Sequence, residues 1–195
     1  MTDALRLLMV VGAATPPGRL AAAIAMAAET AQTDGGDVIV DVLNLAETFI
    51  DICDGRPLDS YNEPTRQAVM RIAGAAAVMI GAPVYRASYP GVLKNLLDIV
   101  PVEGLQNKPV GIVAMGGSIH HYLAVDTQLR HVLAWFGALV APTSVYVTGS
   151  DFREGELASE PARKDLVSLT GTLITLARRL DRASLGPVPL AAKFT

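Results

Sequence analysis

The stretch AAAVMIGAP, residues 75–83, decides the fold class. Its first six residues are all apolar, and Gly81, Ala82 and Pro83 close it. A run this short, without alternating polar residues and followed by glycine and proline, is typical of a strand buried on both faces of a sheet. We therefore predict a strand over Ala75–Ile80 that lies between two layers of helices.

Similar runs alternate with helical segments along the rest of the chain. Four further strands are predicted over 5–11, 38–45, 110–115 and 139–147. Apolar residues at spacings of three and four predict helices over 18–33, 63–74, 90–100, 122–136 and 157–180. Because crossovers between parallel strands are right-handed, this order predicts an α/β fold with a doubly wound, five-stranded parallel sheet and helices on both faces. In this interpretation residues 1–182 form one domain and residues 183–195 a C-terminal tail.

The composition argues against several classes of protein. Hydrophobic residues make up 51% of the 195 residues and charged residues 18%, so a large core is expected and disorder is not. The formal net charge is −3 without a basic stretch, which argues against a nucleic-acid partner. No apolar run has the length of a membrane span. A single cysteine, Cys53, and the lack of a signal-peptide pattern favour a cytoplasmic protein.

Unusual residues gather after the first, third and fourth predicted strands. The carboxyl ends of parallel strands lie at one edge of a doubly wound sheet, and such folds bind ligands at that edge. The loops over 12–19, 81–91 and 115–121 are therefore expected to form one site.

The first of these loops leads from a strand into a helix. Free N–H groups and the helix dipole favour a phosphate at such a place, with Thr15, Gly18 and Arg19 as candidate partners. Pro16 and Pro17 weaken this interpretation because they carry no N–H. The alternative is structural: Thr15 caps the helix, Pro16 is its first residue, and Arg19 is a solvated surface residue.

The second loop carries candidates for contact with a flat heterocycle. Tyr85 can border an aromatic ligand, and Arg86 can meet an acidic group. The backbone at Pro83 and Val84 can bond the edge of a ring. The alternative is that the tyrosines cover the sheet edge or an oligomer contact.

The third loop contains five candidates for the same ligand: Met115, Gly116, Gly117, Ser118 and His121. Its two glycines allow the backbone to approach a ligand closely or to take unusual dihedrals, and its serine can cap the next helix. The adjacent histidines make a poor chelate, so we expect no metal site here, with one histidine packed and one exposed.

Two stretches resemble the NADPH-dependent FMN reductase family: PVYRASYPGVLKNLLD (83–98) and GGSIHHYLAVD (116–126), the latter followed by Leu129, Val132 and Leu133. The similarity runs from the first strand through the fifth and is nearest to reductases paired with sulfonate-degrading monooxygenases. It implies a flavodoxin-like sheet of order 2-1-3-4-5, with FMN and NADPH (or NADH) as cofactors. In that family the segments matching Pro83–Arg86 and Gly116–His121 approach the flavin from its two sides. The helix matching 91–100 commonly helps to build a homodimer, often extended to a homotetramer.

The first loop departs from the family's pattern, Gly-Ser-x-Arg-x-x-Ser. Ala13, Thr15 and Gly18 replace the first serine, the arginine and the last serine. Arg19, at a neighbouring position, can supply the missing charge. The lost groups are worth several kcal/mol, at about 1.5–3 kcal/mol per charged hydrogen bond. FMN is therefore expected either to bind weakly as a diffusing substrate or to give way to a flavin without phosphate, such as riboflavin.

The resemblance implies hydride transfer from NAD(P)H to N5 of FMN, with reduced FMN supplied to a partner flavin-dependent monooxygenase. Such a transfer requires no acid or base from the protein, so no catalytic residue is predicted. Two alternatives remain open. In one, the flavin stays bound and passes electrons to quinones or azo compounds. In the other, the altered loop marks a flavin-free relative that acts as a binding or scaffold subunit.

Overall fold

A central parallel sheet organises the computed structural model, which describes residues 4–15, 18–34, 36–189 and 193. Its strands lie in the order β2-β1-β3-β4-β5, and β6 also pairs with β4. All of these pairs are parallel. The strands are β1 (Leu5–Val11), β2 (Val38–Asn44), β3 (Ala77–Pro83), β4 (Pro109–Gly116), β5 (Leu139–Val140) and β6 (Val145–Thr148). The order confirms the predicted doubly wound, flavodoxin-like topology.

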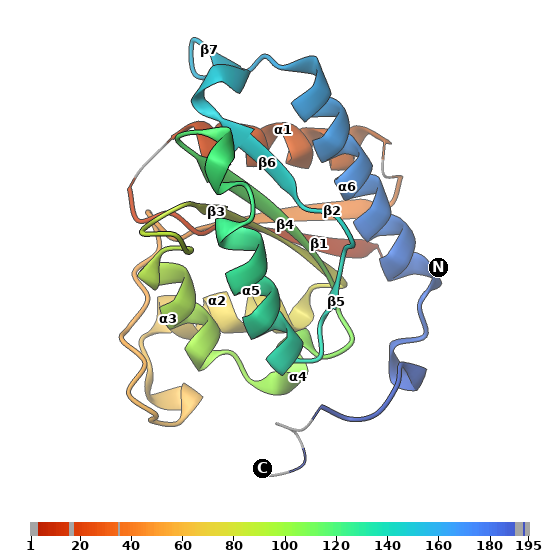
Figure 1. Cartoon of the computed structure of the whole chain (residues 1–195). Coiled ribbons are helices and arrows are strands. Elements are labelled where there is room, and N and C mark those ends of the chain that lie inside the picture. Colours follow the sequence, from red (N-terminus) through yellow and green to blue (C-terminus); the bar gives the residue numbers. More distant parts are fainter. Residues whose placement is uncertain (1–3, 16–17, 35, 190–192, 194–195) are drawn as a thin grey trace.

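Helices cover both faces of the sheet (Figure 1). One hydrophobic core packs α1 (Arg19–Asp34) and α6 (Glu160–Arg179) against the first face. A second core packs the remaining helices against the other face, namely α2 (Glu63–Gly74), α3 (Gly91–Ile99), α4 (Val102–Leu105) and α5 (Ala124–Trp135). Because both faces are covered, the inner residues of β1, β3 and β4 are almost all buried, which explains their apolar runs.

The fifth predicted strand is wrong in one respect, because the structure divides it into β5 and β6. Val110 pairs with Val140, and Val113 pairs with Val145. Between these two pairs β4 advances three residues, while the segment from β5 to β6 advances five. Pro142 lies within the extra segment and has no N–H to donate to the ladder. The proline therefore accounts for the interruption.

Several short elements were not predicted, because two to four residues are too few to show a periodicity. They are α4, the hairpin β7 (Phe152–Arg153) and β8 (Glu156–Leu157), and the 3-10 turns η1 (Leu58–Ser60), η2 (Ile119–His121), η3 (Gly149–Asp151) and η4 (Arg182–Ser184). The last helix begins at Glu160 rather than at 157, since Leu157 belongs to the hairpin. No helix in the described ranges is long and apolar enough to cross a membrane.

The described part of the C-terminal tail lies against its own chain. Directly before the tail, Asn107 Nδ2 donates to the carbonyl oxygen of Arg182 at 2.8 Å. Further along, Pro189 packs beside Gly137, in the turn between α5 and β5. These contacts place the tail at the end of the sheet opposite the three candidate loops (Figure 1).

Candidate functional site

The candidate loops meet in a cavity of about 160 Å³ at the carboxyl edge of the sheet. Six predicted residues line it: Thr15, Gly18, Arg19, Pro83, Tyr85 and Met115. The other lining residues are Val11, Ala13, Leu20, Ala21 and Asn44. The cavity lies beside the ends of β1 and β3, where the strand order reverses, and doubly wound sheets bind their ligands at this point. The remaining predicted residues, namely Val84, Arg86, Gly116, Gly117, Ser118 and His121, do not line it.

Close contact between the ends of β1 and β3 holds the first two loops side by side. The amide of Gly12 donates to the carbonyl oxygen of Gly81 at 2.7 Å. A Cβ atom at Gly12 would lie 2.9 Å from that oxygen and 3.0 Å from Leu93 Cδ2, so only glycine fits. This contact fixes the separation of the two loops at the base of the cavity.

The cavity has a positive end at the start of α1. The first amides of a helix have no partner within it, and the first turn of α1 contains no acidic residue that would neutralise the helix dipole. Arg19 is exposed, and no acidic side chain in the described ranges pairs with it. Its Nη1 atom lies 3.0 Å from the position that a Cβ of Gly149 would take, which places the guanidinium over the loop after β6. This end of the cavity therefore suits an anion.

The structural alternative for Thr15 is wrong, because α1 begins at Arg19, four residues later. Thr15 lies on the exposed part of the loop and lines the cavity. Pro16 and Pro17 fall outside the described residues.

The second loop contains a tight turn with a strained backbone. The amides and carbonyls of Tyr85 and Ser88 are bonded to each other at 2.7 and 2.9 Å. Between them, Arg86 and Ala87 have φ angles of +48° and +63°, a region that side-chain-bearing residues rarely adopt. Type I′ turns of this kind normally contain asparagine or glycine. The two hydrogen bonds of the turn hold Tyr85, which is 47% exposed, at the rim of the cavity.

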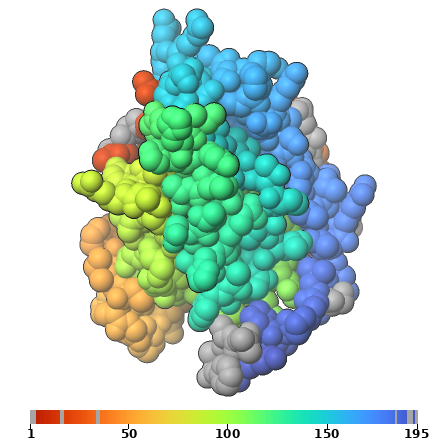
Figure 2. Space-filling view, viewed as in Figure 1, coloured from red at the N-terminus to blue at the C-terminus, as the bar shows by residue number. Residues whose placement is uncertain are grey.

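The third loop is joined to the second by a backbone hydrogen bond. The amide of Val84 donates to the carbonyl oxygen of Met115 at 2.7 Å, so the two loops leave the sheet together. Figure 2 shows the segments after β3 and β4, in yellow-green and green, next to each other on the surface. The loops that the sequence predicted to form one site are therefore neighbours.

Three expectations about the third loop are corrected by the structure. Neither Gly116 nor Gly117 has a positive φ, so unusual dihedrals do not explain this pair. Ser118 stands at the N-cap of η2, but its side chain makes no capping hydrogen bond. Both His120 and His121 are exposed, whereas one was expected to be packed. In the described part of the chain, no group of three or more His, Cys, Asp or Glu side chains could hold a metal ion.

Sequence reasoning missed three residues at this edge. Asn44 lines the cavity from the end of β2. Tyr146 on β6 donates from Oη to the carbonyl oxygen of Ser118 at 2.7 Å. Gly149 follows β6 and lies under Arg19. For Asn44 and Gly149 the available signal was their position at the carboxyl ends of strands, whereas Tyr146 lies inside β6 and carries no such signal.

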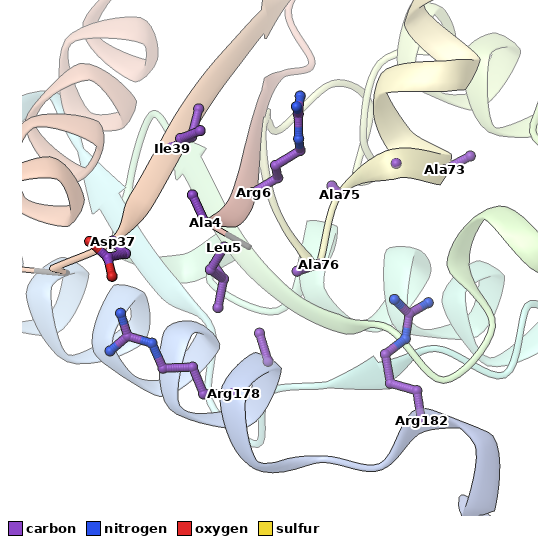
Figure 3. Close-up of a pocket in the computed structure, with 12 residues that line it drawn as sticks. Ala4, Leu5, Arg6, Asp37, Ile39, Ala73, Ala75, Ala76, Arg178 and Arg182 are labelled. Atoms are coloured by element: carbon purple, nitrogen blue, oxygen red, sulfur yellow. The ribbon is translucent and has the colours of Figure 1, made fainter. Parts of the chain in front are cut away.

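A larger cavity, about 950 Å³, lies at the opposite edge of the sheet (Figure 3). Arg6, Arg178 and Arg182 line it, but their guanidinium groups lie well apart in Figure 3. Helix α6 ends here, and basic side chains are favourable beside the last carbonyls of a helix. This role explains Arg178 alone, since Arg6 lies on β1 and Arg182 on η4. Because the three guanidinium groups do not converge, the smaller cavity remains the candidate.

The fold is that of a flavodoxin-like α/β protein, and the candidate cavity lies where its strand order reverses. Residues 5–152 match the family model described as NADPH-dependent FMN reductase, and the chain belongs to that family. It is thus an oxidoreductase with FMN and NAD(P)H as cofactors.

Named relatives and a solved structure are consistent with this assignment. An NAD(P)H-dependent FAD/FMN reductase of Geobacillus thermodenitrificans is 35% identical over 71% of this chain and 75% of its own. An NADH-dependent FMN reductase SfnF of Pseudomonas putida is 31% identical over 83% of this chain and 87% of its own. The apo form of an NADH:FMN oxidoreductase has a TM-score of 0.73 at 24% identity, covering 95% of this chain and 92% of that one. This structural likeness bears on the fold alone.

Proposed function

We propose that the protein reduces FMN with NAD(P)H at the cavity lined by the loops after β1 and β3 and by the end of β4. The observation that carries the proposal is that the loops after β1 and β3 and the end of β4 line one cavity beside the start of α1. When bound, the flavin supplies the hydride-accepting N5 atom. The protein's part is to orient the flavin and the nicotinamide and to limit access of other acceptors.

The phosphate of FMN is placed at the positive end of the cavity. The volume of about 160 Å³ is smaller than the roughly 300–1,000 Å³ of typical small-molecule sites, so it suits the phosphate and adjoining chain rather than the whole cofactor. Arg19 donates to the phosphate in this arrangement, together with the Thr15 hydroxyl and the first amides of α1. The missing serines and arginine of the family pattern make this a weaker site than the family standard.

The flavin ring is placed on the more open surface beyond this cavity. Pro83, Val84, Tyr85 and Arg86 border one side of it in the proposed arrangement. The loop over 115–121, with Gly117 exposed and Ser118 half-buried, approaches from the other. An open ring site allows nicotinamide to stack on the flavin and allows reduced FMN to leave.

We propose further that the protein acts in the cytoplasm as a homodimer or homotetramer and delivers reduced FMN to a flavin-dependent monooxygenase. Two large apolar side chains, Phe49 and Ile52, are 73% and 74% exposed beside the start of α3. The segment that carries them is anchored, because Asn95 on α3 bonds the backbone of Asp51 and Cys53 at 2.8 and 2.9 Å. A rigid exposed apolar surface of this kind supports association through α3.

The proposed reaction is tested by following NAD(P)H oxidation with FMN, FAD and riboflavin as acceptors. We expect turnover with FMN and release of free reduced flavin. Turnover with a quinone but without release of reduced flavin would replace the proposal with an acceptor reductase that retains its flavin. A colourless protein that speeds none of these reactions and binds no flavin would instead support a scaffold role. Parallel assays with NADPH and NADH decide the nucleotide preference.

A further inference from the structure

Tyr146 occupies the space that a side chain at Gly116 would need. It lies on β6, where it pairs with Ala114 of β4, two residues before Gly116. A Cβ atom at Gly116 would lie only 1.8 Å from Tyr146 Oη and 2.8 Å from Cζ. The glycine therefore permits the phenol to lie directly against the backbone of β4.

The same hydroxyl fixes the loop beyond β4. Tyr146 Oη donates to the carbonyl oxygen of Ser118 at 2.7 Å. Because the peptide bond is planar and trans, fixing this carbonyl also directs the N–H of Ile119 away from the phenol. At its other end the loop is tied to the second loop by the bond from Val84 to Met115. The segment 115–118 is thus held at both ends.

The two glycines of this loop have different roles. Gly116 is buried and faces the phenol, whereas Gly117 is exposed, with no atom within 4 Å of the position of a Cβ. Only Gly117 is free to lie close to a ligand. Burial raises the pKa of the Tyr146 phenol, which keeps the hydroxyl protonated and able to donate throughout the neutral pH range.

We propose that Tyr146 is a positioning residue for the flavin ring, which acts by fixing the Ser118 carbonyl and with it the loop that approaches the ring. This inference rests on the proposed function, since it assigns a role in flavin binding to the same loop. It separates Tyr146 from Arg19: the tyrosine acts on the ring side and the arginine on the phosphate side. Removing the hydroxyl should therefore weaken the binding of FMN and of riboflavin by the same factor.

The test is Tyr146→Phe, which keeps the packed ring and removes one hydrogen bond. FMN and riboflavin are titrated separately into the purified protein, and flavin fluorescence is followed. We expect both dissociation constants to rise about three- to tenfold, by the same factor, as for loss of one neutral hydrogen bond. A second readout is the KM for each flavin, which should rise with little change in kcat at saturation.

Tyr61→Phe is the matched control. Tyr61 is 3% exposed, and its hydroxyl lies 3.3 Å from both the amide and a carboxylate oxygen of Asp54, outside the candidate site. It should lower the melting temperature without changing flavin affinity. Wild-type affinities in Tyr146→Phe would overturn the inference and leave the proposed function intact. An affinity loss in Tyr61→Phe equal to that in Tyr146→Phe would also overturn it, because general loosening would then explain both. A wild-type protein that binds neither flavin would overturn the proposed function, and the inference with it.

Discussion

The Nζ atom of Lys108 lies 2.9 Å from the carbonyl oxygen of Ala73, at the carboxyl end of α2. The same amine donates to the carbonyl of Ile72, and the lysine is fully buried. One side chain thus bonds two carbonyls in the last turn of the helix, where carbonyls have no partner in the regular helical pattern. The carbonyl of Ile72 also accepts from the amide of Ala75. Burial, and to a lesser extent the charge of Arg182, lower the pKa of Lys108 to about 7.

This shift predicts that stability rises with pH above 7. Below pH 7 the amine is protonated in both the folded and the unfolded chain, so it does not make the free energy of unfolding depend on pH. Above pH 7 the folded chain loses a proton that the unfolded chain keeps until about pH 10.5, its ordinary value. The unfolded state then binds more protons, and raising the pH stabilises the fold by up to about 1.4 kcal/mol per unit. Urea denaturation of wild type and Lys108→Met at pH 7 and pH 9 checks this: the increase should be smaller in the variant. An equal increase in both would contradict the assignment.

Arg19→Ala should separate binding of the phosphate from binding of the ring. A hydrogen bond to a charged group is worth about 1.5–3 kcal/mol, so FMN affinity should fall about 10- to 100-fold while riboflavin affinity stays unchanged. The measurement is a fluorescence titration with each flavin. Arg179→Ala removes an exposed arginine at the far end of α6 and should affect neither. Unchanged FMN binding in Arg19→Ala would place the phosphate elsewhere.

Gly18→Ser should strengthen FMN binding. The residue precedes α1, has no positive φ, and has no atom within 4 Å of the position of a Cβ, so a serine fits without strain. Its hydroxyl restores one group of the family pattern and also caps the helix, which adds a few tenths of a kcal/mol to stability. One additional hydrogen bond to the phosphate should raise the affinity for FMN about two- to fivefold over wild type, while the affinity for riboflavin stays unchanged. A gain in melting temperature without a gain in affinity would show capping alone.

Ala87→Gly should stabilise the protein, because alanine at φ +63° has a steric cost that glycine lacks. Glycine also raises the entropy of the unfolded chain, which offsets part of this gain. We expect a net increase of about 0.5–1 kcal/mol in the free energy of unfolding. Ala158→Gly is the control: this exposed alanine does not have a positive φ, so the same change there should destabilise. Destabilisation by both changes would mean that the turn is not strained.

Gly116→Ala should disturb the third loop, because its methyl group would overlap the Tyr146 phenol. Clashes in a well-packed region typically cost about 1–3 kcal/mol. Adding Tyr146→Val makes room for the methyl group, so the double variant should melt at a higher temperature than Gly116→Ala alone. Thermal unfolding of wild type, Gly116→Ala, Tyr146→Val and the double variant gives the coupling energy between the two positions. Additive effects would show that the two residues do not compete for the same space.

The sequence by itself determined the layered architecture. The mainly apolar residues of β1, β3 and β4 indicated a sheet covered on both faces, and the alternation with helices indicated that its strands are parallel. The strand ends then placed Thr15, Tyr85 and Met115 at one edge, where the structure brings them into one cavity. Patterns of this kind are local or depend on topology alone, and both can be read along a chain.

Only the tertiary structure decided the contacts between elements that are distant in sequence. The bond from Tyr146 to Ser118, the position of Arg19 over Gly149, and the burial of Lys108 under α2 each join segments more than 25 residues apart. Such contacts depend on how helices and strands pack, and the periodic pattern of apolar residues along the chain does not predict them. The two glycines after β4 illustrate the difference: the sequence marked both as unusual, but packing against the phenol explains only the first.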